Sequence, residues 1–126
     1  MSTEQMSTTF ADYAAQQEAR ENIALAVLSH TMALCEALRH NYERQYGGTQ
    51  KYEFFPETGR KYHKIIMDAN GSRSVHAFVD KKTGEVYKSA SWKSPAKGVR
   101  YDLRLIKDRE WLLENADWAG AYLYAR

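Results

Sequence analysis

The residues best suited to binding chemistry lie in one short stretch, from Lys88 to Arg104. It carries five cations against a single acid, Asp102, although the whole chain has a formal net charge of only +2. Trp92 and Tyr101 lie among these cations, and an aromatic ring beside a cationic side chain commonly stacks a nucleobase while its phosphate meets the charge. The cations are Lys88, Lys93, Lys97, Arg100 and Arg104. The stretch therefore predicts a site for a phosphorylated, base-containing ligand.

An exposed basic loop with Trp92 as a core anchor would give the same pattern. Basic loops are common, and a single tryptophan is more often a packing residue than a binding platform. Gly98 favours the binding interpretation, because glycine lets backbone N–H groups approach an anion closely. The sequence alone leaves both interpretations open.

Other chemistry has little support in the sequence. There is no Walker loop, dinucleotide-binding glycine motif, zinc-protease helix motif or nucleophile elbow. His63 and His76 are expected to be diagonal neighbours on adjacent strands, about 7 to 8 Å apart, but no third metal ligand accompanies them. The basic stretch also has no pair of carboxylates for acid–base catalysis. We therefore expect a binding protein with no metal, no cofactor and no enzymatic activity.

Composition predicts one soluble domain. The chain has 126 residues, of which 44% are hydrophobic and 13% aromatic, enough for a core and too many for a disordered chain. The apolar segment 23–38 is interrupted by polar residues and has no signal-peptide features, so no membrane contact is expected. The single Cys35 is typical of a small buried residue. We expect a cytoplasmic protein in which residues 1–126 form a single domain.

A long helix is predicted over residues 9–46, after a frayed tail at 1–8. The segment contains no proline and no glycine, and Gly47-Gly48 supplies a stop. At 1.5 Å per residue the helix would be about 55 Å long, more than the diameter of so small a domain. Part of it must protrude, kink or meet another chain.

The helix carries two apolar stripes, which is more than one sheet needs. The first stripe consists of Leu25, Leu28, Met32, Cys35, Leu38 and Tyr42, and the second of Ile23, Val27 and Leu34. One stripe can cover the chain's own sheet, and we expect the second to contact another copy. A homo-oligomer, dimer or higher, is therefore predicted. The alternative is a kink that folds both stripes onto one core.

A β-meander is predicted over residues 59–92, after an extended crossing segment at 49–58. Asn70-Gly71 indicates a two-residue hairpin loop, and Lys81-Lys82-Thr83-Gly84 a four-residue one. The strands are expected near residues 60–68, 73–80 and 85–92. The fold class is α+β, with the long N-terminal helix packed on a small antiparallel meander.

Residues 93–126 should form the basic loop and short C-terminal helices. Asp108 is expected to cap a helix that ends near Asn115, and Asp117 to cap a further turn. The aromatic end, from Trp118 to Arg126, must dock on the core, because water would otherwise meet several large apolar side chains.

The two turns also assign side chains to two faces of the meander. The predicted core face consists of Tyr62, Ile66, Val75, Ala77, Val79, Val86 and Ala90. The opposite face mixes aromatic, imidazole and hydroxyl groups, and this composition is typical of a ligand floor or a subunit interface. It consists of His63, Ile65, Met67, His76, Phe78, Tyr87, Ser89 and Ser91.

Several runs of the sequence resemble small bacteriophage proteins. They are Arg60-Lys61-Tyr62, Lys64-Ile65-Ile66, Ser74 to Asp80, Val86 to Lys97, Ala116 to Gly120 and Tyr122-Leu123-Tyr124. Over residues 59–124 the chain is similar to the first family of Thoeris anti-defence proteins. These are phage proteins that sequester cyclic ADP-ribose-type immune signals in the host cell without cleaving them.

The resemblance implies an oligomer with nucleotide pockets at subunit boundaries, where an aromatic ring and an arginine hold the base between them. Phe78 and Arg100 are the residues that match these roles. The asparagine of the family's pocket has no counterpart, and the strand offers Lys88, Ser89 and Ser91 instead. Some members of the family also bind cyclic oligonucleotides at separate sites.

Pattern and resemblance together predict capture of a cyclic nucleotide by Phe78, His76, Lys88, Trp92, Lys93, Lys97, Arg100 and Tyr101. One rival is a phage accessory protein that binds single-stranded nucleic acid, with Trp92 and Tyr101 stacking successive bases. Its binding groove would need a basic stripe across the surface, whereas here the charge is concentrated in one loop, so nucleic acid is disfavoured. Another rival is an inhibitor of a host protein that uses the apolar helix stripe.

Overall fold

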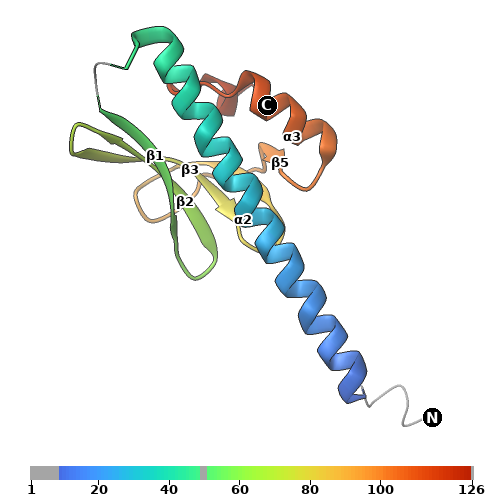
Figure 1. Cartoon of the computed structure of the whole chain (residues 1–126). Coiled ribbons are helices and arrows are strands. Elements are labelled where there is room, and N and C mark those ends of the chain that lie inside the picture. The colour runs from blue at the N-terminus through green and yellow to red at the C-terminus, as the bar shows by residue number, and fades with distance from the viewer. Residues whose placement is uncertain (1–8, 49–50, 126) are drawn as a thin grey trace.

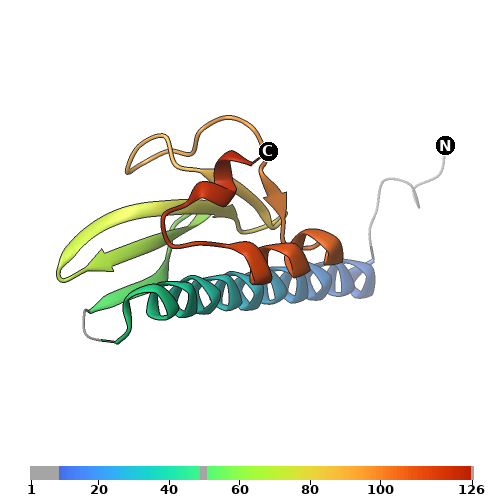
Figure 2. The same ribbon diagram turned by 90° about the horizontal axis from the view of Figure 1, so that it is seen from above.

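The structure is a computed structural model that describes residues 9–48 and 51–125. One long helix packs across one face of a five-stranded antiparallel sheet, and a short helix lies alongside the long one (Figures 1 and 2). The predicted α+β class is confirmed. The elements are α2 (Phe10–Tyr46), β1 (Tyr52–Thr58), β2 (Tyr62–Ala69), β3 (Ser72–Asp80), β4 (Glu85–Lys88), β5 (Tyr101–Asp102), α3 (Ile106–Asn115) and the 3₁₀ helix η1 (Ala121–Tyr124). The predicted tail at residues 1–8 lies outside the described residues.

Helix α2 has the predicted bounds because both of its ends are capped. The Oγ1 of Thr9 accepts a hydrogen bond from the backbone N–H of Asp12 at 3.0 Å. At the other end Gly47 has φ 70° and donates its N–H to the carbonyl of Glu43. The helix runs unbroken for 37 residues, and its N-terminal part extends well past the sheet (Figure 1). The helix therefore protrudes.

Both predicted hairpins are present. Ala69 pairs with Ser72, and Asn70 and Gly71 have φ 53° and 89°, as a two-residue loop of this kind requires. The second loop joins Asp80 to Glu85 and ends on Gly84 at φ 79°. The strand order is β1-β2-β3-β4-β5, so each strand pairs with its neighbour in sequence.

A β-bulge in β3 overturns the predicted division of faces. Ile66 pairs with Val75, but the preceding residue Ile65 pairs with Ala77, so His76 is an extra residue opposite β2. Beyond the bulge, His63 is opposite Val79 and Lys64 is opposite Phe78. The prediction carried one uninterrupted register along the hairpin, which assigned most of β2 to the wrong face.

The helix-facing core therefore differs from the predicted one. Ala77, Val79 and Val86 belong to it as expected, but β1 and β2 contribute Phe54, Ile65 and Met67. Tyr62, Ile66 and Val75 lie outside this cluster, and Ala90 is exposed because β4 ends at Lys88. Of the predicted opposite face, Phe78 and Tyr87 contact Tyr62 on the side away from α2, with ring centroids 5.6 and 6.1 Å from that of Tyr62.

The segment predicted as an extended crossing is the first strand of the sheet. Residues 52–58 pair with β2 along their whole length, so the sheet begins before the predicted meander at 59–92. Pro56 is tolerated here because β1 is an edge strand, where a missing N–H leaves no inner hydrogen bond unmade.

The two predicted stripes of α2 are used differently from the prediction. Val27 and Leu34 of the second stripe are fully buried against the sheet, so this stripe is core and not an interface. The first stripe is divided: Cys35, Leu38 and Tyr42 are buried, whereas Leu25 and Met32 are 65% and 53% exposed. An interface on α2 would therefore use Leu25 and Met32.

The C-terminal segment docks as predicted, although one cap is different. The indole N–H of Trp118 donates to Gln45 at 2.6 Å, and its backbone N–H donates to Asn41, which fixes the end of the chain against α2. Asp117 accepts from the backbone N–H groups of Ala121 and Tyr122. Asp108 does not cap α3; its carboxylate accepts from the N–H of Asp102 in β5.

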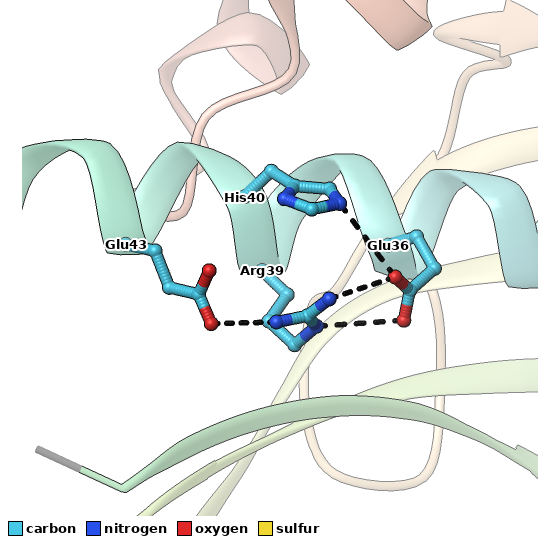
Figure 3. A network of polar contacts seen from close by, with 4 residues as sticks. All are labelled: Glu36, Arg39, His40 and Glu43. Atoms are coloured by element: carbon cyan, nitrogen blue, oxygen red, sulfur yellow. Dashed lines mark hydrogen bonds and ion pairs between the residues drawn. The ribbon is translucent and has the colours of Figure 1, made fainter. Parts of the chain in front are cut away.

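The outer face of α2 carries a self-contained ion-pair network (Figure 3). Arg39 lies between Glu36 and Glu43, one helical turn away on either side, and His40 is 3.8 Å from Glu36. Arg39 lowers the pKa of Glu36 by hydrogen bonding and by its charge. Exposed pairs of this kind stabilise a helix by only about 0.3–0.5 kcal/mol each. No helix among the described residues is long and apolar enough to cross a membrane.

Truncation of two side chains on α2 tests the assignment of its stripes. We expect Leu34→Ala to lower the free energy of unfolding by about 2–5 kcal/mol, because it opens a cavity in the core. Met32→Ala on the exposed side should change it by about 0.5 kcal/mol or less. Urea unfolding followed by circular dichroism measures both, and similar values for the two variants would contradict the assignment.

Candidate functional site

The sheet separates the predicted site residues into two groups. Lys88 is the strand partner of Ala77 and lines a pocket with His76. Phe78 and Trp92 lie on the opposite face, away from α2, where Lys64 contacts both rings. The predicted residues therefore do not converge on one concave region.

Tyr101 is a core residue and not a stacking surface. It is 1% exposed, and its ring stacks on Trp111 at a centroid distance of 5.3 Å. Its hydroxyl donates to the carbonyl of Tyr122 at 2.6 Å, which ties β5 to η1. The ring presents no open face to a ligand, so its role is to hold the C-terminal segment on the sheet.

An aromatic and cationic cluster lies on the sheet face opposite α2. Phe78 is fully buried there, with Tyr62 edge-on to it. The Nζ of Lys64 lies 5.9 Å from the Phe78 ring centroid and 5.3 Å from that of Trp92. Trp92 is 44% exposed. Trp92 is thus the member of this cluster whose ring is open to a ligand, whereas Phe78 is fully buried.

The basic loop that carries Trp92 folds back on itself, on the side of the sheet away from α2 (Figure 2). The N–H groups of Ala90 and Ser91 both donate to the carbonyl of Ser94, and the hydroxyls of Ser91 and Ser94 are 3.0 Å apart. Further on, the N–H of Ala96 donates to the carbonyl of Lys88 at 2.7 Å. These bonds fix the backbone around Trp92. They explain why the strand predicted over residues 85–92 ends at Lys88.

The remaining cations of the loop differ in exposure. Lys93 and Lys97 are exposed, whereas Arg100 is half-buried with its Nε shielded from solvent. The N–H of Arg100 donates to the carbonyl of Val86 at 2.7 Å. Arg100 directly precedes Tyr101, the first residue of β5, whose side chain faces the core. Gly98 has φ 98°, a conformation suited to glycine.

His76 and Lys88 line a separate pocket of about 310 Å³ between the sheet and the C-terminal segment. The Nε2 of His76 is 2.8 Å from the hydroxyl of Tyr122, and the Nζ of Lys88 lies 4.3 Å from the ring centroid of Tyr124. Burial lowers the pKa of His76 to about 4, against an opposing effect of Asp117. The imidazole is therefore neutral at pH 7.

His63 is not the diagonal neighbour of His76, because the bulge moves it opposite Val79. Its Nδ1 is 2.8 Å from the hydroxyl of Thr58, so each histidine has a hydroxyl partner of its own. Among residues 9–48 and 51–125 no group of three or more His, Cys, Asp or Glu side chains is placed to hold a metal ion.

Sequence reasoning missed Lys64 and Tyr62 as members of the cluster around Trp92. Strand alternation does place both on one face with Ile66. Which face of the sheet this is depended on the bulge, and no glycine or proline in the sequence indicated a bulge there. Tyr124 was also missed, because its contact with Lys88 joins residues far apart in the sequence.

The pKa of His76 predicts a pH dependence of stability. Its folded-state value lies below the ordinary value of 6.5, so its contribution is present above that pH and lost as the pH falls towards 4. We expect the free energy of unfolding to decrease over this range in wild type and to decrease less in His76→Gln, which does not titrate. Urea unfolding at a series of pH values tests this, and identical pH profiles would contradict the role of His76.

Comparison with known proteins adds a family but no activity. No curated protein and no solved structure matches the chain. The model of a family described as "Family of unknown function (DUF7717)" matches residues 10–125, which is nearly the whole chain. The chain therefore belongs to this family of unknown function.

Proposed function

We propose that this protein binds a cyclic nucleotide of the cyclic ADP-ribose type and sequesters it without cleaving it. In this proposal it is a phage anti-defence protein of the Thoeris-inhibitor kind and acts in the cytoplasm of the host cell. The observation that carries the proposal is the half-exposed Trp92 ring, held by a hydrogen-bonded basic loop above Lys64.

The surface around Trp92 offers both contacts that such a ligand needs. A base can stack on the open side of the indole, because every base has a flat π-face. Lys93 and Lys97 are exposed on the same loop and can meet the phosphates. Arg100 lies at the end of this loop, and its planar guanidinium suits both stacking and bidentate phosphate binding.

Binding without turnover agrees with the state of the candidate reactive groups. Cys35 is buried, and burial raises the pKa of its thiol to about 12, so the nucleophilic thiolate does not form at neutral pH. The Nε2 of His76 lies beside the Tyr122 hydroxyl, within hydrogen-bonding distance, and the ring is neutral. Neither group lies on the face that carries Trp92.

A homo-oligomer with a second copy of the chain is part of the proposal, as the resemblance to the anti-defence family implies. Exposed apolar side chains on α2 provide a contact surface for that copy. They are Phe10, Tyr13, Leu25 and Met32, which are between 53% and 86% exposed.

The assembly has its own test. We expect light scattering to give a mass of at least twice that of the chain, and the double variant Leu25→Glu/Met32→Glu to lower it by introducing charge into the contact. Both positions are exposed, so the variant should stay folded. A monomeric wild type would remove the basis for pockets shared between chains.

The ligand site is tested by calorimetry with cyclic ADP-ribose. We expect Trp92→Ala to weaken binding by about 1–3 kcal/mol, the usual loss for a base–aromatic stack. Arg100→Ala should abolish tight binding, and Arg100→Lys should restore little of it. Trp92→Phe, which keeps a flat ring, and Lys107→Ala on α3 serve as controls that should bind nearly as wild type. Ligand released by heat should be intact by mass spectrometry.

Two outcomes would contradict the proposal. Wild-type affinity in both Trp92→Ala and Arg100→Ala would exclude this surface as the site. Conversion of the cyclic nucleotide to a linear product by the pure protein would show catalysis. Phe78→Ala is not a useful binding variant, because it removes a buried ring and should cost about 3–5 kcal/mol of stability.

A further inference from the structure

A cleft of about 980 Å³ is lined by no residue of the basic stretch 88–104. It lies between the N-terminal half of α2 and the sheet, where the helix runs past the sheet's end (Figure 1). Ile23 and Ala24 give it an apolar part on the helix. The connection between β1 and β2, the end of β3 and the loop between β3 and β4 form its other wall. Its volume is in the range of small-molecule sites, about 300–1,000 Å³.

The lining of this cleft is strongly cationic. It contains five cations and two carboxylates, a net formal charge of +3, which exceeds the +2 of the whole chain. The cations are Arg20, Arg60, Lys61, Lys81 and Lys82. Within residues 9–48 and 51–125 none of them forms an ion pair. Arg39, by contrast, is neutralised by a glutamate on each side (Figure 3).

The side chains of three of the five cations contact neutral groups. The Nζ of Lys81 donates to the carbonyl of Gly59 at 2.9 Å, and Arg20 donates to the amide oxygen of Gln17 at 3.0 Å. The Nζ of Lys61 lies 5.3 Å from the ring centroid of Tyr62. Contacts of this kind orient a cation without cancelling its charge, so the cleft keeps its positive potential.

The two carboxylates are outnumbered by the five cations. Asp80 is 7% exposed, and its Oδ1 accepts from the backbone N–H groups of Lys82 and Thr83, so it serves the turn between β3 and β4. Glu21 lies on α2. The pKa of the buried His63 is lowered mainly by burial and further by the charge of Lys81, which agrees with a positive potential inside the cleft wall.

We propose that this cleft binds a small molecule carrying two or more phosphate groups, of the nucleoside polyphosphate class. Cations from three separate segments surround the space, which suits a ligand whose negative charge is spread over several oxygens. The apolar surface of Ile23 and Ala24 provides a place for the base or sugar. This site is independent of the surface around Trp92 and of the function proposed for it.

The test uses sodium tripolyphosphate and ATP as probes, with calorimetry at low ionic strength. Wild type should bind each at one site per chain. The double variant Lys61→Glu/Lys82→Glu should lose about tenfold or more in affinity, because two charges beside the phosphates are reversed. Both lysines are exposed, so the fold should be kept, which thermal unfolding checks. The matched control, Lys51→Glu/Lys107→Glu, changes the net charge equally at exposed positions outside the cleft and outside the basic loop, and should bind within about twofold of wild type.

Several results would overturn the inference. Equal losses in the two double variants would mean that the probes respond to overall charge. Absence of saturable binding, or affinity for oligothymidylate that rises with its length, would also contradict a small-molecule cleft. Loss of tripolyphosphate binding in Trp92→Ala would show that no separate site exists. If tripolyphosphate binds as expected while cyclic ADP-ribose does not bind at all, only the function proposed for the Trp92 surface fails.

Discussion

The fold depends on one helix packing across one face of a five-stranded sheet. Burial of Val27, Leu34 and Leu38 against that face creates the core, and each of these side chains is worth about 1.5–3 kcal/mol when removed from water. Two consequences follow. The other face of the sheet needs its own cover, and the N-terminal end of the helix extends past the sheet (Figure 1).

Both consequences place potential binding surfaces at the edges of the core. The basic loop lies on the side of the sheet that α2 leaves uncovered and presents Trp92 above Lys64. The overhanging half of α2 forms one wall of the cleft that contains Arg20 and Lys81. In each case a rigid element, the sheet or α2, is packed on one side. Its solvent-exposed side can therefore carry ligand-binding residues at little cost in stability.

The helices and hairpins were predicted from the sequence more accurately than the face of the sheet on which each side chain lies. Local signals determine α2, with its Thr9 and Gly47 caps, and the hairpin at Asn70-Gly71, so these were found. The bulge at His76 has no such signal, since it arises from the pairing of two strands. One extra residue in β3 changes which side chains of β2 share a face with those of β3, so the predicted faces of β2 were wrong. For the same reason the predicted site was divided: His76 and Phe78 were assigned to one face, whereas they lie on opposite faces.

The cationic surfaces were also only partly predictable from the order of residues in the sequence. The basic stretch from residue 88 to 104 is visible because its cations are close together in the sequence. The cations of the cleft come from α2, the β1–β2 connection and the β3–β4 loop. Only folding brings them together. A near-neutral chain can therefore carry two separate cationic surfaces, provided that its acids pair elsewhere, as Glu36 and Glu43 do with Arg39. Local charge imbalance in the fold, and not net charge, is what attracts an anionic ligand to a particular site.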